Sequence, residues 1–328
     1  MNRFEIITPA DLKQASQLLT EPNRAALAGG VDLVDLMKQD IAAPSSVVNL
    51  KGLKELDGIE TRPNGDLRLG ALVKLSEVAE HPLINSRFTA IAEAAGEAAT
   101  PQIRNLGTVG GNLLQRPRCW YFRNPNALCL KKGGDTCFSI GGQNRYHAIF
   151  GGGPSFIVHP SNLAPALIAF NASAKLVSAS GERMVALENF FTLPSVDPKR
   201  ENDLKPGEIL TEVIVPAPPR DARSAYLELR EKQSFDWPLV SVAVMLSTSA
   251  KRVASSRIVL GAVAPIPWRV PDAEKALAGA AVDDVHARAA AEVALKSAQP
   301  MSDNGYKIVI AKVLVRRAIL KAAGGAEV

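Results

Sequence analysis

A glycine-rich stretch at residues 107–113, Gly-Thr-Val-Gly-Gly-Asn-Leu, constrains the fold of this chain more than any other feature of its sequence. Glycine tolerates positive φ and lets a ligand approach the backbone where a Cβ would otherwise stand. Consecutive backbone amides in such a turn form a concave site for an anion. The stretch therefore predicts a phosphate-binding loop, in which a branched side chain at Gly110 or Gly111 should exclude the phosphate.

A second glycine turn lies near the N-terminus. The apolar residues 25–28 predict a strand, which runs into Gly29 and Gly30 and then into a predicted helix from Val31. A helix N-terminus in this arrangement can bind an anion, because its first amides have no partner within the helix. Taken alone, two glycines between a strand and a helix are more often only a tight turn.

The order of the predicted elements divides the chain into two parts. Up to residue 218, strands alternate with helices, which predicts an α/β domain. The segment Pro-Ala-Pro-Pro-Arg at 216–220 is the clearest candidate for a boundary. Beyond it, strands near 225–229, 239–246 and 257–263 and helices near 273–277, 284–297 and 304–322 predict an antiparallel sheet covered by helices. We therefore expect an α+β protein with domains at 1–218 and 219–328.

All three cysteines lie in one insertion of the first domain, residues 115–150, at Cys119, Cys129 and Cys137. This segment is polar and aperiodic, and a structureless connection of that length is usually functional or disordered. An odd number of cysteines in one loop is not a disulfide framework. His147 is a candidate fourth ligand, and a solvent-facing histidine is the alternative. From the residues alone, three cysteines and one histidine predict a tetrahedral zinc site.

Composition excludes some classes of partner. The net charge of +5 comes from Lys and Arg scattered along the chain, without the basic, aromatic-rich run typical of nucleic-acid binding. No apolar run approaches the roughly 20 residues that span a bilayer. The N-terminal segment is too short and too acidic to be a signal peptide. We expect a protein that stays in the cytoplasm, or that reaches the periplasm by co-export with a partner carrying the signal.

Four segments together resemble the FAD-binding (medium) subunits of the molybdenum hydroxylases, which include xanthine dehydrogenase, carbon monoxide dehydrogenase and aldehyde oxidoreductase complexes. The segments are 27–35, 100–114, 159–167 and 208–216, of which 108–113 is the most specific. The resemblance covers essentially the whole chain. It implies a two-part α/β FAD-binding domain of the vanillyl-alcohol-oxidase/PCMH type and a C-terminal domain of the CO dehydrogenase flavoprotein type.

The resemblance also implies the contacts of a noncovalent FAD. The two glycine loops would surround its pyrophosphate, Leu114 and Leu210 would border the isoalloxazine, and Trp237 would stack there or fill the seam between the domains. Asn162 stands where the family usually has Asp, and a neutral side chain would ease formation of an anionic reduced flavin. The full implied set is Leu27, Ala28, Gly29, Gly30, Val31, Asp32, Leu33, Thr100, Ile103, Arg104, Asn105, Gly107, Thr108, Gly110, Gly111, Asn112, Leu114, Asn162, Leu210 and Trp237.

The cysteine-rich segment resembles that of only one subset of the family. A subset of the family, including periplasmic aldehyde oxidoreductases and 4-hydroxybenzoyl-CoA reductase, carries a [4Fe–4S] cluster in this insertion. The resemblance thus places such a cluster, ahead of zinc, on Cys119, Cys129, Cys137 and His147, although four thiolates are the usual set. Residues 116–122 look closest to the aldehyde oxidoreductase type. Their aromatic run at 120–122 predicts either an interface or a small core.

The function implied is electron transfer. A large molybdenum-cofactor subunit would oxidise the substrate, an aldehyde, a small [2Fe–2S] subunit would pass the electrons on, and the FAD of this chain would deliver them to an external acceptor. No catalytic acid or base is expected here, and the substrate pocket would lie in another polypeptide. The alternatives are a stand-alone flavin oxidase of the vanillyl-alcohol-oxidase type, a hydroxybenzoyl-CoA-reductase-like subunit, and a zinc-stapled scaffold.

Overall fold

The computed structural model describes residues 1–232, 235–250 and 252–324, so the last four residues of the expected second domain lie outside it. The N-terminal part is a small parallel sheet of order β1-β3-β2, formed by β1 (Glu5–Ile7), β2 (Arg24–Leu27) and β3 (Ser46–Asn49). Helices α1 (Leu12–Leu18) and α2 (Val31–Lys38) make the connections that parallel pairing requires. The short 3₁₀ turns η1 (Leu50–Gly52) and η2 (Lys54–Leu56) follow β3.

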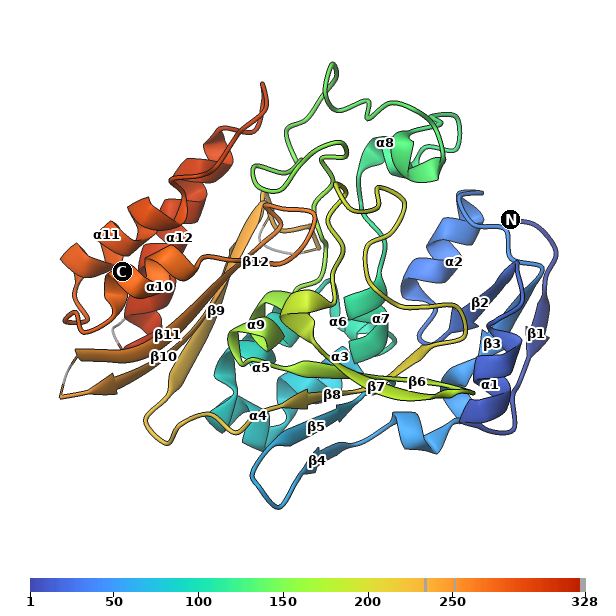
Figure 1. The fold of residues 1–328 in the computed structure, drawn as a ribbon, viewed down its shortest axis with the longest axis horizontal. Coiled ribbons are helices and arrows are strands. Elements are labelled where there is room, and N and C mark those ends of the chain that lie inside the picture. Colours follow the sequence, from blue (N-terminus) through green and yellow to red (C-terminus); the bar gives the residue numbers. More distant parts are fainter. Residues whose placement is uncertain (233–234, 251, 325–328) are drawn as a thin grey trace.

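A second, antiparallel sheet forms the centre of the molecule. Its order is β4-β5-β8-β6-β7, from β4 (Ile59–Thr61), β5 (Leu67–Gly70), β6 (Ser173–Ser178), β7 (Gly181–Ala186) and β8 (Ile209–Val215). Every residue of β8 is buried, as expected of a central strand. The short helices α3 (Leu75–Glu80), α4 (Pro82–Arg87), α5 (Thr89–Glu97), α6 (Pro101–Arg104), α7 (Val109–Leu114) and α9 (Leu163–Ala169) lie between this sheet and the C-terminal sheet (Figure 1).

The C-terminal sheet is antiparallel, in the order β12-β11-β10-β9, with β9 (Arg223–Leu229), β10 (Val240–Ser249), β11 (Arg252–Gly261) and β12 (Trp268–Arg269). Successive side chains of a strand point to opposite faces. Val242 and Val244 accordingly join the core under α10 (Pro271–Leu277), α11 (Asp284–Ala294) and α12 (Tyr306–Ala322), whereas Ala243 joins the core of the central part. The expected antiparallel sheet with helices is confirmed, and its helices lie at the opposite end of the molecule from the parallel sheet (Figure 1).

The cysteine-rich segment runs over the top of the molecule in Figure 1 and contains only α8 (Trp120–Arg123) and the 3₁₀ turn η3 (Leu130–Lys132) as regular structure. Single hydrogen bonds, rather than a strand of a sheet, hold its end, among them those from the amides of Ile149 (2.8 Å) and Phe150 (3.1 Å) to the carbonyl of Val263. Asn144 donates to Ser302 Oγ (2.8 Å) and accepts from the amide of Asp303 (2.9 Å), and Lys307 Nζ donates to the carbonyl of Tyr146 (3.0 Å). The 3₁₀ turn η4 (Leu187–Asn189) completes the elements.

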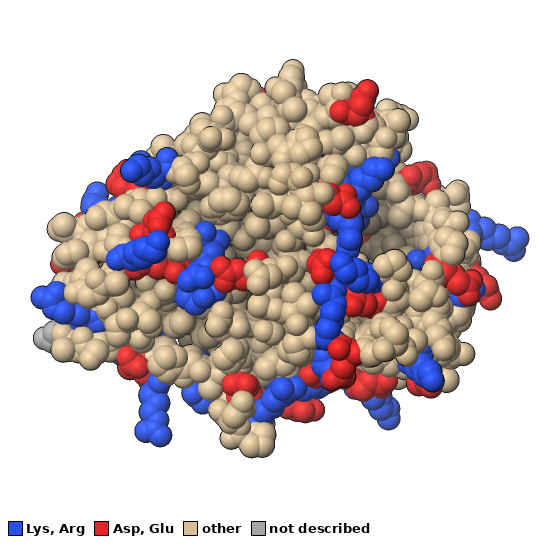
Figure 2. All heavy atoms as spheres, in the orientation of Figure 1, with Lys and Arg blue, Asp and Glu red and all other residues tan. Residues whose placement is uncertain are grey.

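Charged side chains of both signs are scattered over the face shown in Figure 2, and few of them lie at the top, over the cysteine-rich segment. Within the described ranges, no helix has the length and apolarity to cross a membrane.

Candidate functional site

The two glycine loops meet at a cavity of about 330 Å³, within the range of small-molecule sites. Its walls come from the start of α2, from α6 and α7, from the first residues of β8 and from the N-terminus of α9. The loop between β9 and β10 contributes Trp237, so the C-terminal part closes one side. Segments far apart in the sequence therefore form one site.

The loop before α2 presents free backbone donors to this cavity. Gly30 has φ of 77° at the N-cap of α2, a left-handed conformation that glycine adopts without strain. The amides of Val31, Asp32 and Leu33 donate to no other described residue. A Cβ on Gly29 would lie 1.9 Å from the carbonyl oxygen of Leu106, so only glycine lets the two loops touch. This helix end is suited to bind an anion.

In the second glycine loop, three of the amides expected to face a phosphate donate within the protein. Gly110 donates to the carbonyl of Ala71 (2.9 Å), Gly111 to Thr108 Oγ1 (3.1 Å) and Asn112 to the carbonyl of Thr108 (2.8 Å). The first bond fastens α7 to the residue that follows β5 of the central sheet, and the other two form the N-cap and first turn of α7. A Cβ on Gly110 would lie 3.1 Å from atoms of Ala71, so this glycine serves close packing. The loop shapes the cavity wall beside the free amides of α2.

The structure brings together all the implied cofactor-binding residues except Leu27, Thr100, Arg104 and Asn105. Thr100 instead caps α6, accepting from the amide of Ile103 (3.2 Å), and Arg104 donates to the carbonyl of Ala98 (3.0 Å). The sequence interpretation also missed lining residues. Some lie within or directly after the four segments, at 208–209 and 115–118, so a wider window would have found them. The missed residues are Ala26, Leu36, Leu50, Leu56, Ala71, Leu72, Leu75, Ala98, Ala99, Gln115, Arg116, Arg118, Leu204, Glu208 and Ile209.

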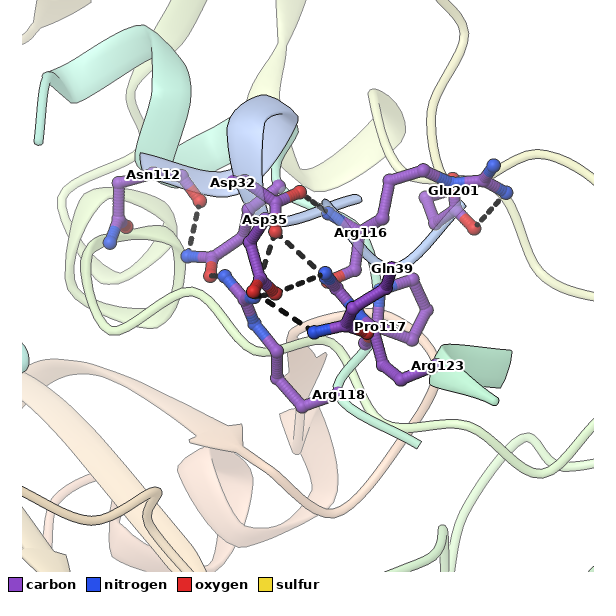
Figure 3. Close-up of polar contacts among 10 residues, drawn as sticks. Asp32, Asp35, Gln39, Asn112, Arg116, Pro117, Arg118, Arg123 and Glu201 are labelled. Carbon is purple, nitrogen blue, oxygen red and sulfur yellow. Dashed lines mark hydrogen bonds and ion pairs between the residues drawn. The ribbon is translucent and has the colours of Figure 1, made fainter. Parts of the chain in front are cut away.

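Asp32, in the first turn of α2, ties the cavity to the cysteine-rich segment (Figure 3). Its carboxylate pairs with Arg118 (2.8 Å) and Arg123 (2.7 Å) and accepts from the amide of Arg116 (2.8 Å). Burial lowers the pKa of Arg118 to about 10, although Asp32 opposes that shift. The Arg118 guanidinium also lies over the Trp237 ring, 4.5 Å from its centroid, a cation–π contact. The charge of Asp32 is thus neutralised within the protein.

The three cysteines line a second, much smaller cavity of about 10 Å³. His147 Nε2 lies 3.2 Å from Cys119 Sγ, and the His147 side chain is buried, so the alternative of a solvent-facing histidine is wrong. Burial raises the pKa of Cys119 to about 11 and lowers that of His147 to about 4. Within the described part of the chain, no group of three or more His, Cys, Asp or Glu is placed to share one metal ion.

The aromatic residues at 120–122 were expected to form either a small core or an interface, and their side chains differ in exposure. Phe122 is fully buried in a small core with Leu36 and Cys129. Trp120 remains 38% exposed and packs edge-on against Tyr146, with ring centroids 5.4 Å apart. The run therefore both packs the segment onto α2 and leaves an aromatic side chain at the surface.

Two family models match the chain. The one described as the FAD binding domain in molybdopterin dehydrogenase matches residues 2–218, and the CO dehydrogenase flavoprotein C-terminal domain matches residues 224–322. The aldehyde oxidoreductase FAD-binding subunit PaoB of Escherichia coli (strain K12) is 34% identical over 93% of this chain and 92% of its own length. The carbon monoxide dehydrogenase medium chain of Hydrogenophaga pseudoflava is 28% identical over 97% and 96%.

Two solved structures have a similar fold over almost the full length of this chain. A carbon monoxide dehydrogenase from Hydrogenophaga pseudoflava has a TM-score of 0.78 at 27% identity and covers 98% of both chains. Quinoline 2-oxidoreductase from Pseudomonas putida 86 has a TM-score of 0.78 at 26% identity, covering 100% of this chain and 99% of that one. The chain belongs to the family of FAD-binding subunits of the molybdenum hydroxylases, oxidoreductases in which this subunit transfers electrons.

Proposed function

We propose that this chain is the FAD-binding subunit of an aldehyde-oxidising molybdenum hydroxylase and passes electrons to an external acceptor. The observation that carries this proposal is the cavity between the two glycine loops, with the unpartnered amides of α2 at one end. The likeness to an aldehyde oxidoreductase subunit over almost the whole chain supports the choice of substrate class. The partners would be a large molybdenum-cofactor subunit and a small [2Fe–2S] subunit.

The residues of the cavity fit FAD. The amides of Val31, Asp32 and Leu33 would hold the pyrophosphate, and Leu114 and Leu210 would border the isoalloxazine. FAD, when bound, accepts and releases electrons, while the protein binds and orients it. Asp32 offers the pyrophosphate no free charge, because Arg118 and Arg123 pair with its carboxylate.

The absorption spectrum of the purified complex tests this function. Flavin bands, with FAD released by acid precipitation, are expected for a noncovalent flavoprotein. A colourless chain that takes up no added FAD would refute the proposal. If the isolated chain oxidised aldehydes or alcohols with oxygen alone, the rival stand-alone flavin oxidase would replace it.

We further propose that Cys119, Cys129 and Cys137 bind a [4Fe–4S] cluster with His147. Three thiols on one cavity, with a buried imidazole beside Cys119, are a suitable donor set. Metal binding would also stabilise a segment with little regular structure.

Metal analysis and EPR of the anaerobically reduced protein test the cluster. We expect iron beyond that of the [2Fe–2S] subunit and a separate cluster signal in the wild type, and loss of both in Cys137→Ser. His147→Ala should alter the signal, and His286→Ala, at a partly exposed position on α11, serves as its matched control. Stoichiometric zinc without iron would contradict the cluster and support the zinc alternative. Iron and a signal unchanged by His147→Ala would remove His147 from the ligands.

A further inference from the structure

The side chain of Asn162 faces the cavity although the helix that it begins does not need it. Asn162 occupies the N-cap position of α9 but makes no capping hydrogen bond. The neighbouring Ser161 does that work, because its Oγ accepts from the amide of Ala164 (2.9 Å). Ser161 Oγ also donates to Asn112 Oδ1 (2.6 Å), which fixes the helix end against α7. The Asn162 amide is therefore free for another role.

Strand β9 sets the orientation of that amide. Asn162 Nδ2 donates to Glu228 Oε2 (2.8 Å) and to Tyr226 Oη (3.4 Å), and Tyr226 Oη donates to the same Glu228 oxygen (2.6 Å). Arg230 pairs with the other Glu228 oxygen. An ionised carboxylate only accepts hydrogen bonds. The amide nitrogen of Asn162 must therefore face Glu228, and its carbonyl oxygen must point away from it.

Burial makes this orientation costly to reverse. The Glu228 side chain is 3% exposed, and that of Arg230 is 7% exposed. Burial raises the pKa of Glu228, while the hydrogen bonds from Tyr226, Arg230 and Asn162 oppose the shift. A flipped amide would place two acceptors against each other, and leaving buried polar groups unsatisfied is unfavourable. Within the described chain, Asn162 Oδ1 accepts from no residue and is left for the cavity.

We propose that Glu228 is a positioning residue that holds the Asn162 carbonyl toward the flavin as the acceptor for a ring N–H formed on reduction. This inference rests on the proposed binding of FAD. Two electrons, from the iron–sulfur partner, and one proton convert the oxidised ring to its anionic reduced form, and the proton forms a new N–H at N5. An acceptor fixed beside that N–H stabilises the reduced ring alone, so it raises the midpoint potential of the flavin.

Redox titration of the intact complex, with dithionite and mediators and followed across the visible spectrum, tests the inference. Glu228→Gln keeps the shape of the side chain but lets the Asn162 amide turn. We expect about a tenfold loss of the preference for reduced over oxidised FAD, which lowers a two-electron midpoint by about 30 mV. The matched control is Glu97→Gln, because Glu97 pairs with Arg230 at 2.8 Å but contacts neither Asn162 nor the cavity.

A second variant decides the question if Glu228→Gln does not fold. Asn162→Leu removes the acceptor and leaves Glu228 bonded to Tyr226 and Arg230, so it should lower the midpoint at least as much. A flavin potential equal to that of Glu97→Gln in either folded variant would overturn the inference while FAD binding stands. A wild-type complex without flavin would instead refute the proposed function.

Discussion

Gly111 is the glycine of the cavity wall at which a side chain would disturb the protein least. An added Cβ would meet only Thr108 Oγ1, at 3.0 Å, whereas at Gly29 it would meet the Leu106 carbonyl oxygen at 1.9 Å. We expect Gly111→Val to weaken FAD binding at least about tenfold, equal to about 1.4 kcal/mol, in a protein that still folds. Flavin content and thermal unfolding measure the two effects. Gly52→Val, at an exposed glycine with open space around it, should keep full flavin.

His159 is expected to make stability depend on pH. Burial lowers its pKa from 6.5 to about 4, so the folded protein keeps it neutral where the unfolded chain binds a proton. The free energy of unfolding does not depend on His159 above pH 6.5. As the pH drops from there toward 4, it falls by roughly 3 kcal/mol. Denaturant unfolding between pH 4 and 7 should show a shallower slope in His159→Gln than in the wild type. An identical slope in both proteins would contradict the assignment.

For single residues, the sequence predicted the positions that surround the cavity better than it predicted the role of each side chain or amide. The motifs placed Gly30, Gly111 and Asn162 at the site, and all three line it. They could not predict that the amide of Gly110 is used by Ala71, because that partner lies on another segment and only the fold brings it near. For the same reason, Glu228 beside Asn162 was not foreseen.

Among the elements, α2 and the cysteine-rich segment depend on each other through Arg123. Its guanidinium pairs with Asp32 (2.7 Å) and Asp35 (3.0 Å) and donates to the carbonyl of Pro117 (2.8 Å), with only 10% of the side chain exposed. Breaking a buried pair costs about 3–5 kcal/mol, and Asp32 retains Arg118, so Arg123→Met should cost roughly 2 kcal/mol. We expect proteolytic cleavage within residues 115–150 before the rest of the chain.

The control for that prediction is Lys275→Met. Lys275 pairs with Asp272 at 2.9 Å, but both side chains are largely exposed, and such pairs contribute only about 0–1 kcal/mol. The two variants remove the same kind of charge from opposite environments. Equal resistance to proteolysis in both would show that Arg123 does not hold the segment.

Elements with a clear period were predictable, and the cysteine-rich segment was not. The strand predicted near 239–246 is β10, in which Val242 and Ala243 join cores on opposite faces. Residues 115–150 have no such period, because single hydrogen bonds to distant groups hold them, such as Lys307 to the Tyr146 carbonyl and the Ile149 amide to the Val263 carbonyl. Contacts of this kind leave no pattern in a local window of sequence.

In the molecule as a whole, the cysteine-rich segment covers one side of the region where the central and C-terminal parts meet (Figure 1). Its surface is unusually apolar. Leu128 is 64% exposed and Ile140 60%, and Trp120, Phe138 and Tyr146 are each more than a third exposed. Apolar surface with few charges around it commonly marks a protein–protein contact. We therefore expect this surface to lie against a partner subunit of the complex.

The double variant Leu128→Glu/Ile140→Glu tests that expectation. Burying one large aliphatic side chain contributes about 1.5–3 kcal/mol, so placing two carboxylates in the contact should weaken assembly at least about a hundredfold. Size-exclusion chromatography after co-expression with the partner subunits measures it, and flavin content reports on the fold of the variant chain. Val285→Glu, at a position 73% exposed on α11 among the C-terminal helices, makes the same change away from this surface and should assemble normally. If the double variant also assembled normally with full flavin, this surface would face solvent in the complex, and the partners would have to dock elsewhere.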